Sequence, residues 1–469
     1  TVAALVASPP AAGDAAAGGR VGAVGPYLAL YILIDGSAAF VASQAGVSSP
    51  VASGVLIATA VVSLELLRRL TLPGASGAVP EPDRWYAGSL ALLAVAGGAA
   101  VAYVTTGPVV LAAVVVTGLA AAVALARALT PVGSEDTRRG PSLTLAGLAA
   151  GFGYVLPVML FQTHYELEFP FDNRYLPVVA AVLLGVAGTG RRPSPAAGQR
   201  GGLLTRPALS SVLAALTLLV PLGMAVTAPP VPESRQTGSA VRLLSWNVRY
   251  GRDATGRPDP ETIAATIERE APDVVLLQEV SRGWPIGGAT DLAEWLSRRL
   301  AMRYEWSPAA DGQFGNVILT RMPYSEVTAR RLPFVEGPMQ RSFLGVTLHL
   351  TDGGELRIID AHLQHRKQNT RTRLVQSEAL LAEWAGGPRT VIAGDFNFWP
   401  SWPEPQVFFA AGFQSAQDAT GHGAEFTTVG GDRVDWIFGT PDLTFSDFVI
   451  RSDVTTSDHH PLVVTVTPA

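Results

Sequence analysis

The sequence predicts two parts, an all-α membrane domain with several spans and then an α/β domain in which two packed β-sheets are flanked by helices. The 469 residues are 48% hydrophobic and only 16% charged, whereas an average soluble domain is about 25% charged. The mean hydropathy of +0.28 supports a membrane part, because soluble proteins of this length rarely have so apolar a composition. Strand and helix patterns that follow one another after residue 240 predict the second part.

Charge divides the chain near residue 232. Residues 1–232 hold 12 arginines and 10 acidic residues, and residues 233–469 hold 22 basic and 29 acidic residues. The first part therefore has a net charge of +2 and the second of −7. The segment at 228–234 is rich in proline, as short stiff linkers are. We expect a membrane domain over 1–227, a linker over 228–240 and a second domain over 241–469.

Seven apolar runs in the first part are long enough to cross a bilayer, or nearly so. Alanine and glycine dominate them, which suits close packing of helices in lipid. The alternative is an alanine-rich soluble bundle, but a bundle needs polar faces and most of these runs have none. Asp35 weakens the first run, and its shortness weakens the sixth. The runs lie at roughly 26–46, 51–70, 86–106, 108–128, 143–163, 175–190 and 207–227.

Arginines gather in alternate connections between these runs, which predicts the orientation of the chain in the membrane. Basic connections face the cytoplasm in most membrane proteins. Seven spans that begin inside therefore place residues 233–469 at the outer face of the cell membrane. The arginines lie in the second connection (Arg68, Arg69, Arg84), the fourth (Arg138, Arg139) and the sixth (Arg191, Arg192, Arg200, Arg206).

Two polar features of the first part have a functional and a structural interpretation. Asp35 lies within a predicted span, where an acid often has a function, unless the span starts later and Asp35 lies near an interface. His164 and the acidic connection 165–172 are expected on the same side as the second domain. That connection either lines an approach to a site there or is a solvated loop.

The second part combines many strands with few helices, which favours two packed sheets with flanking helices over a single βαβ winding. Several strand runs, such as 273–279, are apolar on both faces, as buried strands are. Asp259 and Pro260 form a helix start with an N-cap and a proline at the first helical position. We expect strands at 242–248, 273–279, 316–320, 342–350, 356–361, 390–393, 434–438, 445–451 and 461–466, and helices from 259, at 290–301 and at 370–385.

Acids, amides and histidines follow these apolar strands, where strand ends hold side chains rigidly at one edge of a sheet. Carboxylate and amide oxygens suit Mg²⁺ or Mn²⁺ rather than zinc. Because the chain has no cysteine, thiol nucleophiles, disulfides and cysteine metal sites are excluded. Metal and imidazolium groups together can neutralise charge on phosphate oxygens. The candidate residues are Asn247, Glu279, His362, Asp395, Asn397, Asp435, Asp458 and His459.

These motifs differ in strength when each is taken alone. Gln278-Glu279 is also compatible with an ordinary strand exit, and His362 with a buried structural histidine. Gly394-Asp395-Phe396-Asn397 is stronger, because it holds two polar groups where a turn alone needs one. The strongest is Ser457-Asp458-His459-His460-Pro461, which places an acid and a histidine directly before the final strand.

Taken in order, the motifs resemble the endonuclease/exonuclease/phosphatase (DNase I-like) superfamily over about 220 residues. Ala361 stands where the family usually has threonine, and Thr320-Arg321 replaces a serine-basic pair, but neither change touches a charged role. The matching pieces are Leu-Ser-Trp-Asn247, Leu-Leu-Gln278-Glu279, Gly315 to Pro323, Asp360-Ala-His362-Leu, Gly394-Asp-Phe-Asn397, Arg433-Val-Asp435-Trp-Ile and Ser457-Asp-His459-His-Pro461.

The resemblance implies a four-layer fold and a Mg²⁺-dependent phosphoesterase. Carried over by position, Glu279 resembles the principal metal ligand, with Asn247 beside it and Asp458 close by. Asp395 resembles the residue that orients or deprotonates the attacking water, and Asn397 its partner.

The resemblance also assigns roles to the histidines. His459 resembles the histidine that contacts the scissile phosphate, and Asp435 the carboxylate that fixes its tautomer. His362 resembles the second histidine, which protonates the leaving oxygen or stabilises charge. Arg341 and Arg371 are weaker candidates for phosphate contacts, with surface or fold-supporting roles as the favoured interpretation.

The layout also suggests a substrate class. A linker of about ten residues spans at most roughly 35 Å, so a site tied to a membrane domain meets lipid more often than free nucleic acid. Similar layouts occur in superfamily branches that act on glycolipid anchors and on polyprenyl pyrophosphate. We expect a phospholipid, glycolipid-anchor or polyprenyl phosphate substrate and the lipid bilayer as partners. Nucleic acid is the less favoured partner, and the sequence indicates no protein partner. The alternatives are an extracellular nuclease, which the −7 charge disfavours, and a non-catalytic lipid-binding or transport protein.

Overall fold

The computed structural model describes residues 21–71, 86–129, 143–189, 219, 223, 238–253 and 255–469. The predicted linker, the run at 207–227 and most of the basic connections lie almost wholly outside these residues. The chain divides into two units. The first comprises Thr1–Thr163 and Phe171–Ala228, and the second comprises His164–Pro170 and Pro229–Ala469.

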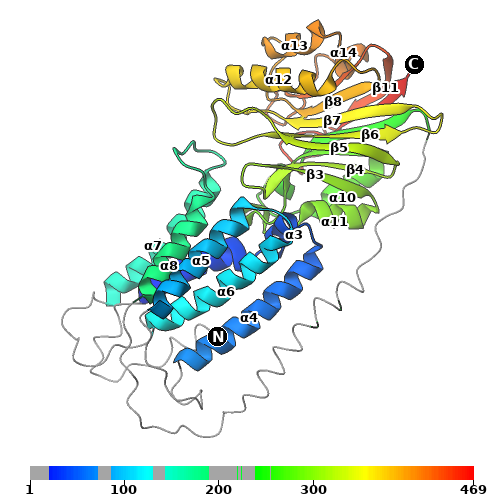
Figure 1. The fold of residues 1–469 in the computed structure, drawn as a ribbon. Helices are drawn as coiled ribbons and strands as arrows, with labels where there is room; N and C mark the ends of the chain where they lie inside the picture. Colours follow the sequence, from blue (N-terminus) through cyan, green and yellow to red (C-terminus); the bar gives the residue numbers. More distant parts are fainter. Residues whose placement is uncertain are drawn as a thin grey trace, which may run out of the picture. The chain divides into compact units, whose positions relative to one another are not determined.

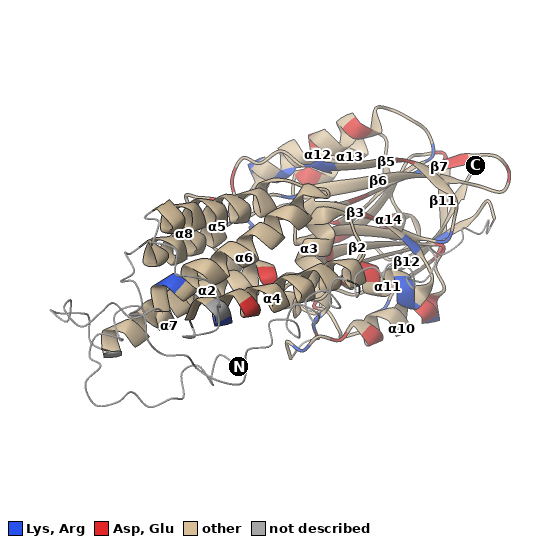
Figure 2. Cartoon of the chain, turned by 60° about the horizontal axis from the view of Figure 1, so that its bottom comes forward, with Lys and Arg blue, Asp and Glu red and all other residues tan. Residues whose placement is uncertain are grey.

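The described part of the first unit is helical. Four of its helices are long and apolar enough to cross a membrane, and a bent helix pair makes a fifth if it counts as one span. Figure 2 shows these helices almost entirely in tan, with few charged positions. The helices are α2 (Val24–Leu30), the π-helical η2 (Tyr31–Asp35), α3 (Ala38–Ala45), α4 (Ser49–Thr71), α5 (Tyr86–Val104), α6 (Val109–Leu129), α7 (Leu143–Thr163) and α8 (Tyr175–Gly188).

Two of the predicted spans differ from simple membrane helices. The first is broken at Gly36 and Ser37, where the chain bends by 52°. The Ser37 hydroxyl accepts a hydrogen bond from the Phe40 amide and so starts α3 as a new helix. Asp35 lies at this bend. The sixth predicted span, α8, has 14 residues and is about 21 Å long, shorter than the hydrocarbon core of about 30 Å.

Small residues let the helices of this unit approach closely, as the alanine- and glycine-rich sequence predicts. A Cβ atom at Gly25 of α2 would lie 2.0 Å from the backbone oxygen of Ala150 in α7. Only glycine therefore permits this crossing.

The second unit contains two six-stranded sheets. The first has the strand order β11-β12-β1-β2-β4-β3, and the second has the order β5-β6-β7-β8-β10-β9. The strands of the first sheet are β1 (Val241–Asn247), β2 (Val274–Ser281), β3 (Arg303–Ala309), β4 (Phe314–Thr320), β11 (Leu443–Ile450) and β12 (Leu462–Pro468). Those of the second are β5 (Tyr324–Arg331), β6 (Ser342–His349), β7 (Glu355–His362), β8 (Thr390–Asp395), β9 (Gln414–Ser415) and β10 (Asp435–Gly439).

The sheets pack face to face, and helices cover their outer faces. In Figure 1, α12 and α13 lie above the second sheet, and α10 and α11 lie below the first. This is the predicted four-layer arrangement of two packed sheets between helices. The helices are α10 (Pro260–Glu270), α11 (Leu292–Leu300), α12 (Thr370–Trp384), α13 (Glu404–Ala410) and α14 (Ala416–Ala419), with short 3₁₀ turns at Arg249–Gly251 and Pro285–Gly287.

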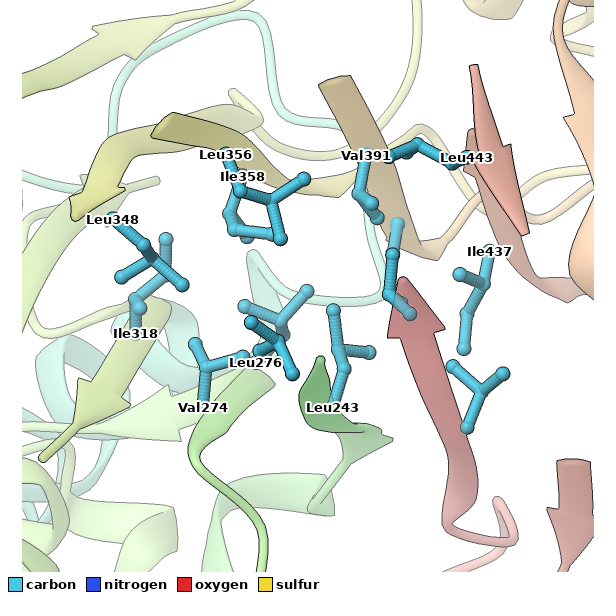
Figure 3. Packing of buried hydrophobic residues seen from close by; sticks show 14 of the residues in the cluster. Leu243, Val274, Leu276, Ile318, Leu348, Leu356, Ile358, Val391, Ile437 and Leu443 are labelled. Atoms are coloured by element: carbon cyan, nitrogen blue, oxygen red, sulfur yellow. The ribbon is translucent and has the colours of Figure 1, made fainter. Parts of the chain in front are cut away.

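Alternating side chains of each central strand enter two different cores, because successive residues of a strand point to opposite faces. In β2, Leu276 packs in the core between the sheets (Figure 3) and Val275 packs against α10 and α11. In β8, Val391 faces the core between the sheets and Ile392 faces α12 and α13. Burial on both faces explains the continuous apolar runs that predict these strands.

Candidate active site

The central strands of each sheet run parallel, and each parallel pair ends in polar residues. β1 pairs with β2 in the first sheet, and β7 pairs with β8 in the second. Asn247 ends β1, and Glu279 lies near the end of β2. His362 ends β7 and Asp395 ends β8, where the two residues are direct partners in the pairing. Carboxyl ends of parallel strands meet at one edge of a sheet, where sites commonly form.

Asp395 links groups from both sheets. Its Oδ2 accepts a hydrogen bond of 2.9 Å from the Asn247 side-chain amide. The same oxygen lies 3.3 Å from His362 Nε2 and 3.7 Å from His459 Nε2. Burial raises the pKa of Asp395 to about 7, although the nearby His459 opposes this shift. A carboxyl group that titrates near neutrality can take up and release a proton at neutral pH.

Backbone geometry holds Asp395 in place. Gly394 has φ of 138°, and a Cβ there would lie 2.0 Å from the backbone oxygen of Ala361, so glycine is required before Asp395. Asn397 has φ of 53°. Its amide donates to Asp395 Oδ1 at 3.1 Å, and its side chain donates to the Leu363 carbonyl at 3.3 Å. The predicted turn therefore carries both polar residues, but the Asn397 side chain bonds to the backbone.

His459 forms a charged pair with Asp435. Its Nδ1 lies 3.0 and 2.9 Å from the two Asp435 carboxylate oxygens. Burial lowers the pKa of His459, but Asp435 and Asp395 outweigh it and hold this pKa well above its usual value. His459 is therefore cationic at neutral pH and can stabilise negative charge on a phosphate.

The loop that carries His459 is tied to β1. The Ser457 hydroxyl donates to the Asn247 carbonyl at 2.7 Å, and the Trp246 indole donates to the His459 carbonyl at 2.9 Å. Asp458 is more open, since its side chain is 51% exposed and lies 3.7 Å from Arg249. An exposed carboxylate at this place remains able to bind an ion or substrate.

His362 differs from His459 because its partner is a cation. Arg341 Nη1 lies 3.2 Å from His362 Nδ1, and Arg341 Nη2 lies 2.8 Å from His365 Nδ1. A guanidinium can only donate, so both Nδ1 atoms accept and the His362 proton lies on Nε2, toward Asp395. Burial is the main cause that lowers the pKa of both histidines, and the positive charge of Arg341 adds to it. The pKa of His362 lies well below its usual value, and that of His365 is lowered to about 3.

The two candidate arginines have different environments. Arg341 is fully buried between the two histidines, whereas Arg371 is exposed in the first turn of α12. No described contact brings Arg371 to the cluster. The sequence did not single out His365, although it follows His362 by only three positions.

Glu279 occupies a strained position in β2. The pairing of β2 with β4 shifts between Leu277 and Val280, and Glu279 in this bulge has φ of 55°. Bulges often re-aim a side chain beside an active site, and a left-handed non-glycine residue there carries strain. Burial raises the pKa of Glu279, and the negative charge of Asp458 raises it further. The positive charges of Arg341 and His459 lower this pKa. Glu279 therefore lies within electrostatic range of the other candidate residues.

One group in the described part of the chain has the geometry to hold a metal ion. Ligand atoms of Asp395, Asp435 and His459 lie within 4.8 Å of one another. Both oxygens of Asp435 already face His459 Nδ1, so an ion bound by all three would displace that pair. This group differs from the ligand set that the resemblance suggested, Asn247, Glu279 and Asp458.

The sandwich also contains a polar contact between its sheets, which the motifs did not predict. Gln278 of β2 donates a hydrogen bond of 2.7 Å to Asp360 of β7. Both side chains are fully buried. Burial raises the pKa of Asp360 well above its usual value, so this carboxyl keeps its proton to a higher pH than an exposed carboxyl does.

Solved structures similar to the chain include an endonuclease/exonuclease/phosphatase from Beutenbergia cavernae, with 23% identity over 49% of this chain and 72% of that one, at a TM-score of 0.43. The human Nocturnin catalytic domain with a bound sulfate has 21% identity over 52% of this chain and 100% of that one, at a TM-score of 0.41. D. rerio TDP2 in complex with a single-strand DNA product has 20% identity over 49% of this chain and 99% of that one, at a TM-score of 0.40. No curated protein matches the chain.

A family model matches nearly the whole second unit. Residues 244–459 match the model of the Endonuclease/Exonuclease/phosphatase family. This range contains every candidate residue described above. The second unit is therefore similar to the endonuclease/exonuclease/phosphatase family over residues 244–459.

Proposed function

We propose that the chain is a divalent-metal-dependent phosphoesterase of the membrane, which hydrolyses the phosphate ester of a lipid or lipid-linked substrate. The observation that carries this proposal is the placement of Asp395 beside Asn247 and His362, with the cationic His459 next to it. A titratable carboxyl beside a fixed cation is what water attack on a phosphate ester needs.

The donor atoms fit a hard divalent cation. Glu279 and Asp458 offer carboxylate oxygens, and Asp458 raises the pKa of the buried Glu279 through charge repulsion, which a bound cation would relieve. Asn247 offers an amide oxygen beside them. Such oxygen ligands suit Mg²⁺ or Mn²⁺, and the ion would supply charge neutralisation for the phosphate oxygens.

The protein groups divide the remaining work. Asp395 orients a water molecule and takes its proton as the water oxygen attacks phosphorus, and the ester P–O bond then breaks. His459, held by Asp435, stabilises the charge that develops on the phosphate oxygens. The leaving oxygen receives a proton from water, while the neutral His362 can donate a hydrogen bond from Nε2–H to that oxygen, so the products are a phosphate and an alcohol.

The apolar helices of the first unit favour a lipid substrate. Four or five apolar helices of spanning length keep a site on the same chain beside lipid, and the arginine pattern favours the outer face. We therefore propose a phospholipid, glycolipid-anchor or polyprenyl phosphate rather than nucleic acid.

Lipid mass spectrometry tests this proposal. Purified full-length protein in detergent is incubated with Mg²⁺ and a total lipid extract, beside the variant Asp395→Ala. A lipid that the wild type consumes and the variant spares supports the proposal and names the substrate. Equal lipid profiles combined with Mg²⁺-dependent cleavage of a DNA or RNA oligonucleotide would overturn the lipid substrate in favour of a nuclease.

A further inference from the structure

A short segment from the helical half of the sequence belongs to the catalytic unit. Residues His164–Pro170 lie between α7 and α8 in the sequence, but by their contacts they form part of the second unit. Glu166 Oε2 lies 2.9 Å from Arg366 Nη2. An arginine–carboxylate pair holds the segment at this point.

Tyr165 lies at the centre of an aromatic cluster in that unit. Its ring centroid is 5.4 Å from Trp284, 5.6 Å from Phe314 and 5.7 Å from Tyr250, in edge-on arrangements. It also stacks on His365 at 6.0 Å with an interplanar angle of 11°. Rings on several sides fix the position of this side chain, since each such contact favours one geometry.

The Tyr165 hydroxyl reaches the carboxylate that the proposed function assigns to the metal. It lies 2.6 Å from Glu279 Oε1. A carboxylate only accepts, so the phenol donates this hydrogen bond. One hydrogen bond to one oxygen leaves Glu279 Oε2 and the other lone pair of Oε1 available for a cation.

Glu279 needs such a partner more than an ordinary strand residue does. It lies in a β-bulge with a left-handed backbone, where the regular pairing of the sheet does not dictate the direction of the side chain. Partners that bond to a metal ligand orient it and tune its basicity, and their loss typically weakens metal binding about 10- to 100-fold.

We propose that Tyr165 is a positioning residue that orients Glu279 for the metal ion, and that the segment His164–Pro170 is thereby part of the phosphoesterase site. This inference rests on the proposed function, because it takes Glu279 as a metal ligand. It assigns a role in the hydrolytic site to a residue outside the family's sequence range.

The test measures metal binding directly. Full-length protein in detergent is titrated with Mn²⁺, and free Mn²⁺ is followed by electron paramagnetic resonance. Tyr165→Phe keeps the ring and removes only the hydroxyl. We expect its dissociation constant for Mn²⁺ to rise about tenfold. Tyr175→Phe is the matched control, because Tyr175 is an exposed tyrosine of α8, and we expect it to bind Mn²⁺ like the wild type.

A second variant separates the segment from the hydroxyl. Glu166→Gln weakens the ion pair with Arg366 and leaves Tyr165 intact, so we expect a smaller rise in the dissociation constant than for Tyr165→Phe. The Mg²⁺ concentration that half-activates phosphoester hydrolysis should rise in the same order.

The outcomes distinguish this inference from the proposed function. Unchanged or tighter Mn²⁺ binding by Tyr165→Phe, with a wild type that binds Mn²⁺ and hydrolyses phosphoesters, would overturn the positioning role alone. Weaker binding by Tyr165→Phe without any phosphoester hydrolysis by the wild type would sustain the positioning role and overturn the proposed function. A wild type that neither binds Mn²⁺ nor hydrolyses phosphoesters would overturn both.

Discussion

The two sheets of the second unit are built alike but present different side chains at their strand ends. Each has a central parallel pair, β1–β2 in the first sheet and β7–β8 in the second, with antiparallel strands on either side. At the ends of these pairs, the first sheet presents Asn247 and Glu279, and the second presents His362 and Asp395. A repeated scaffold therefore carries two complementary half-sites rather than two copies of one.

The difference lies in the neighbours of each pair. In the first sheet, Glu279 has a strained backbone and its carboxylate accepts a hydrogen bond from a phenol, which suits a metal ligand. In the second, Asp395 lies between histidines, which suits proton transfer. We therefore expect changes in the second sheet to lower the rate constant and changes in the first to lower metal affinity.

The largest effect is expected for Asp395→Asn. This variant keeps the shape of the side chain but cannot accept a proton, so kcat for bis(4-nitrophenyl) phosphate should fall about a thousandfold, with little change in Mn²⁺ affinity. Steady-state kinetics and Mn²⁺ titration measure the two quantities. Asp447→Asn, at an exposed position of β11, is the control. If Asp395→Asn kept a kcat near that of the wild type, Asp395 would not be the group that takes the proton from water.

A smaller loss is expected for Asp435→Asn. The amide cannot hold His459 as a cation, so kcat should fall about a hundredfold while Mn²⁺ affinity stays within about twofold of the wild type. If Mn²⁺ affinity fell as steeply as kcat, the group formed by Asp395, Asp435 and His459 would be the metal site instead.

Glu279→Gln tests the other half-site. Loss of a metal ligand should cost at least as much Mn²⁺ affinity as loss of the Tyr165 hydroxyl, about tenfold or more. Hydrolysis should stop when EDTA removes the metal from the wild type, and high Mg²⁺ should restore much of the activity of Glu279→Gln. A variant whose activity does not respond to added Mg²⁺ would contradict a metal role for the first sheet.

The smallest effect concerns the contact between the sheets. Because burial raises the pKa of Asp360, the folded state keeps its proton to higher pH than the unfolded state does. Stability should therefore fall as pH rises from the usual carboxyl range toward the raised pKa. Asp360→Asn should remove this slope and give a higher unfolding midpoint at pH 7.

Unfolding can be followed in the full-length protein by tryptophan fluorescence between pH 5 and 8. Of the nine tryptophans, only Trp85 precedes residue 241, so the signal reports mainly the second unit. A lower midpoint for Asp360→Asn at every pH would show that the ionised carboxylate stabilises the fold.

Much of the fold could be predicted from the sequence, because buried strands leave a strong signal. β2 and β8 are apolar on both faces and were predicted. β3 and β5 were missed, because they are edge strands with partly exposed side chains that include many polar residues. The break at Gly36 was also missed, since an apolar run does not reveal a bend.

The candidate site was less predictable than the fold. Motifs after strands pointed to Asn247 and Asp395, and the structure places these two side chains in contact. The position of Arg341 between two histidines depends on strand pairing, which no local pattern encodes. The sequence offered the connection 165–172 as a possible approach to a site, but it did not predict the contact of Tyr165 with Glu279, because the two residues are 114 positions apart and Tyr165 lies outside every motif.

The arrangement of the two half-sites has a consequence for folding. Each parallel pair and its connecting helix form from neighbouring residues, β1-α10-β2 in one case and β7-α12-β8 in the other. The bond between Asn247 and Asp395 instead joins residues 148 positions apart, and closing so long a loop carries an entropy penalty that local pairing avoids. During refolding, secondary structure should therefore precede catalysis, and the appearance of activity should mark the moment when the two sheets dock.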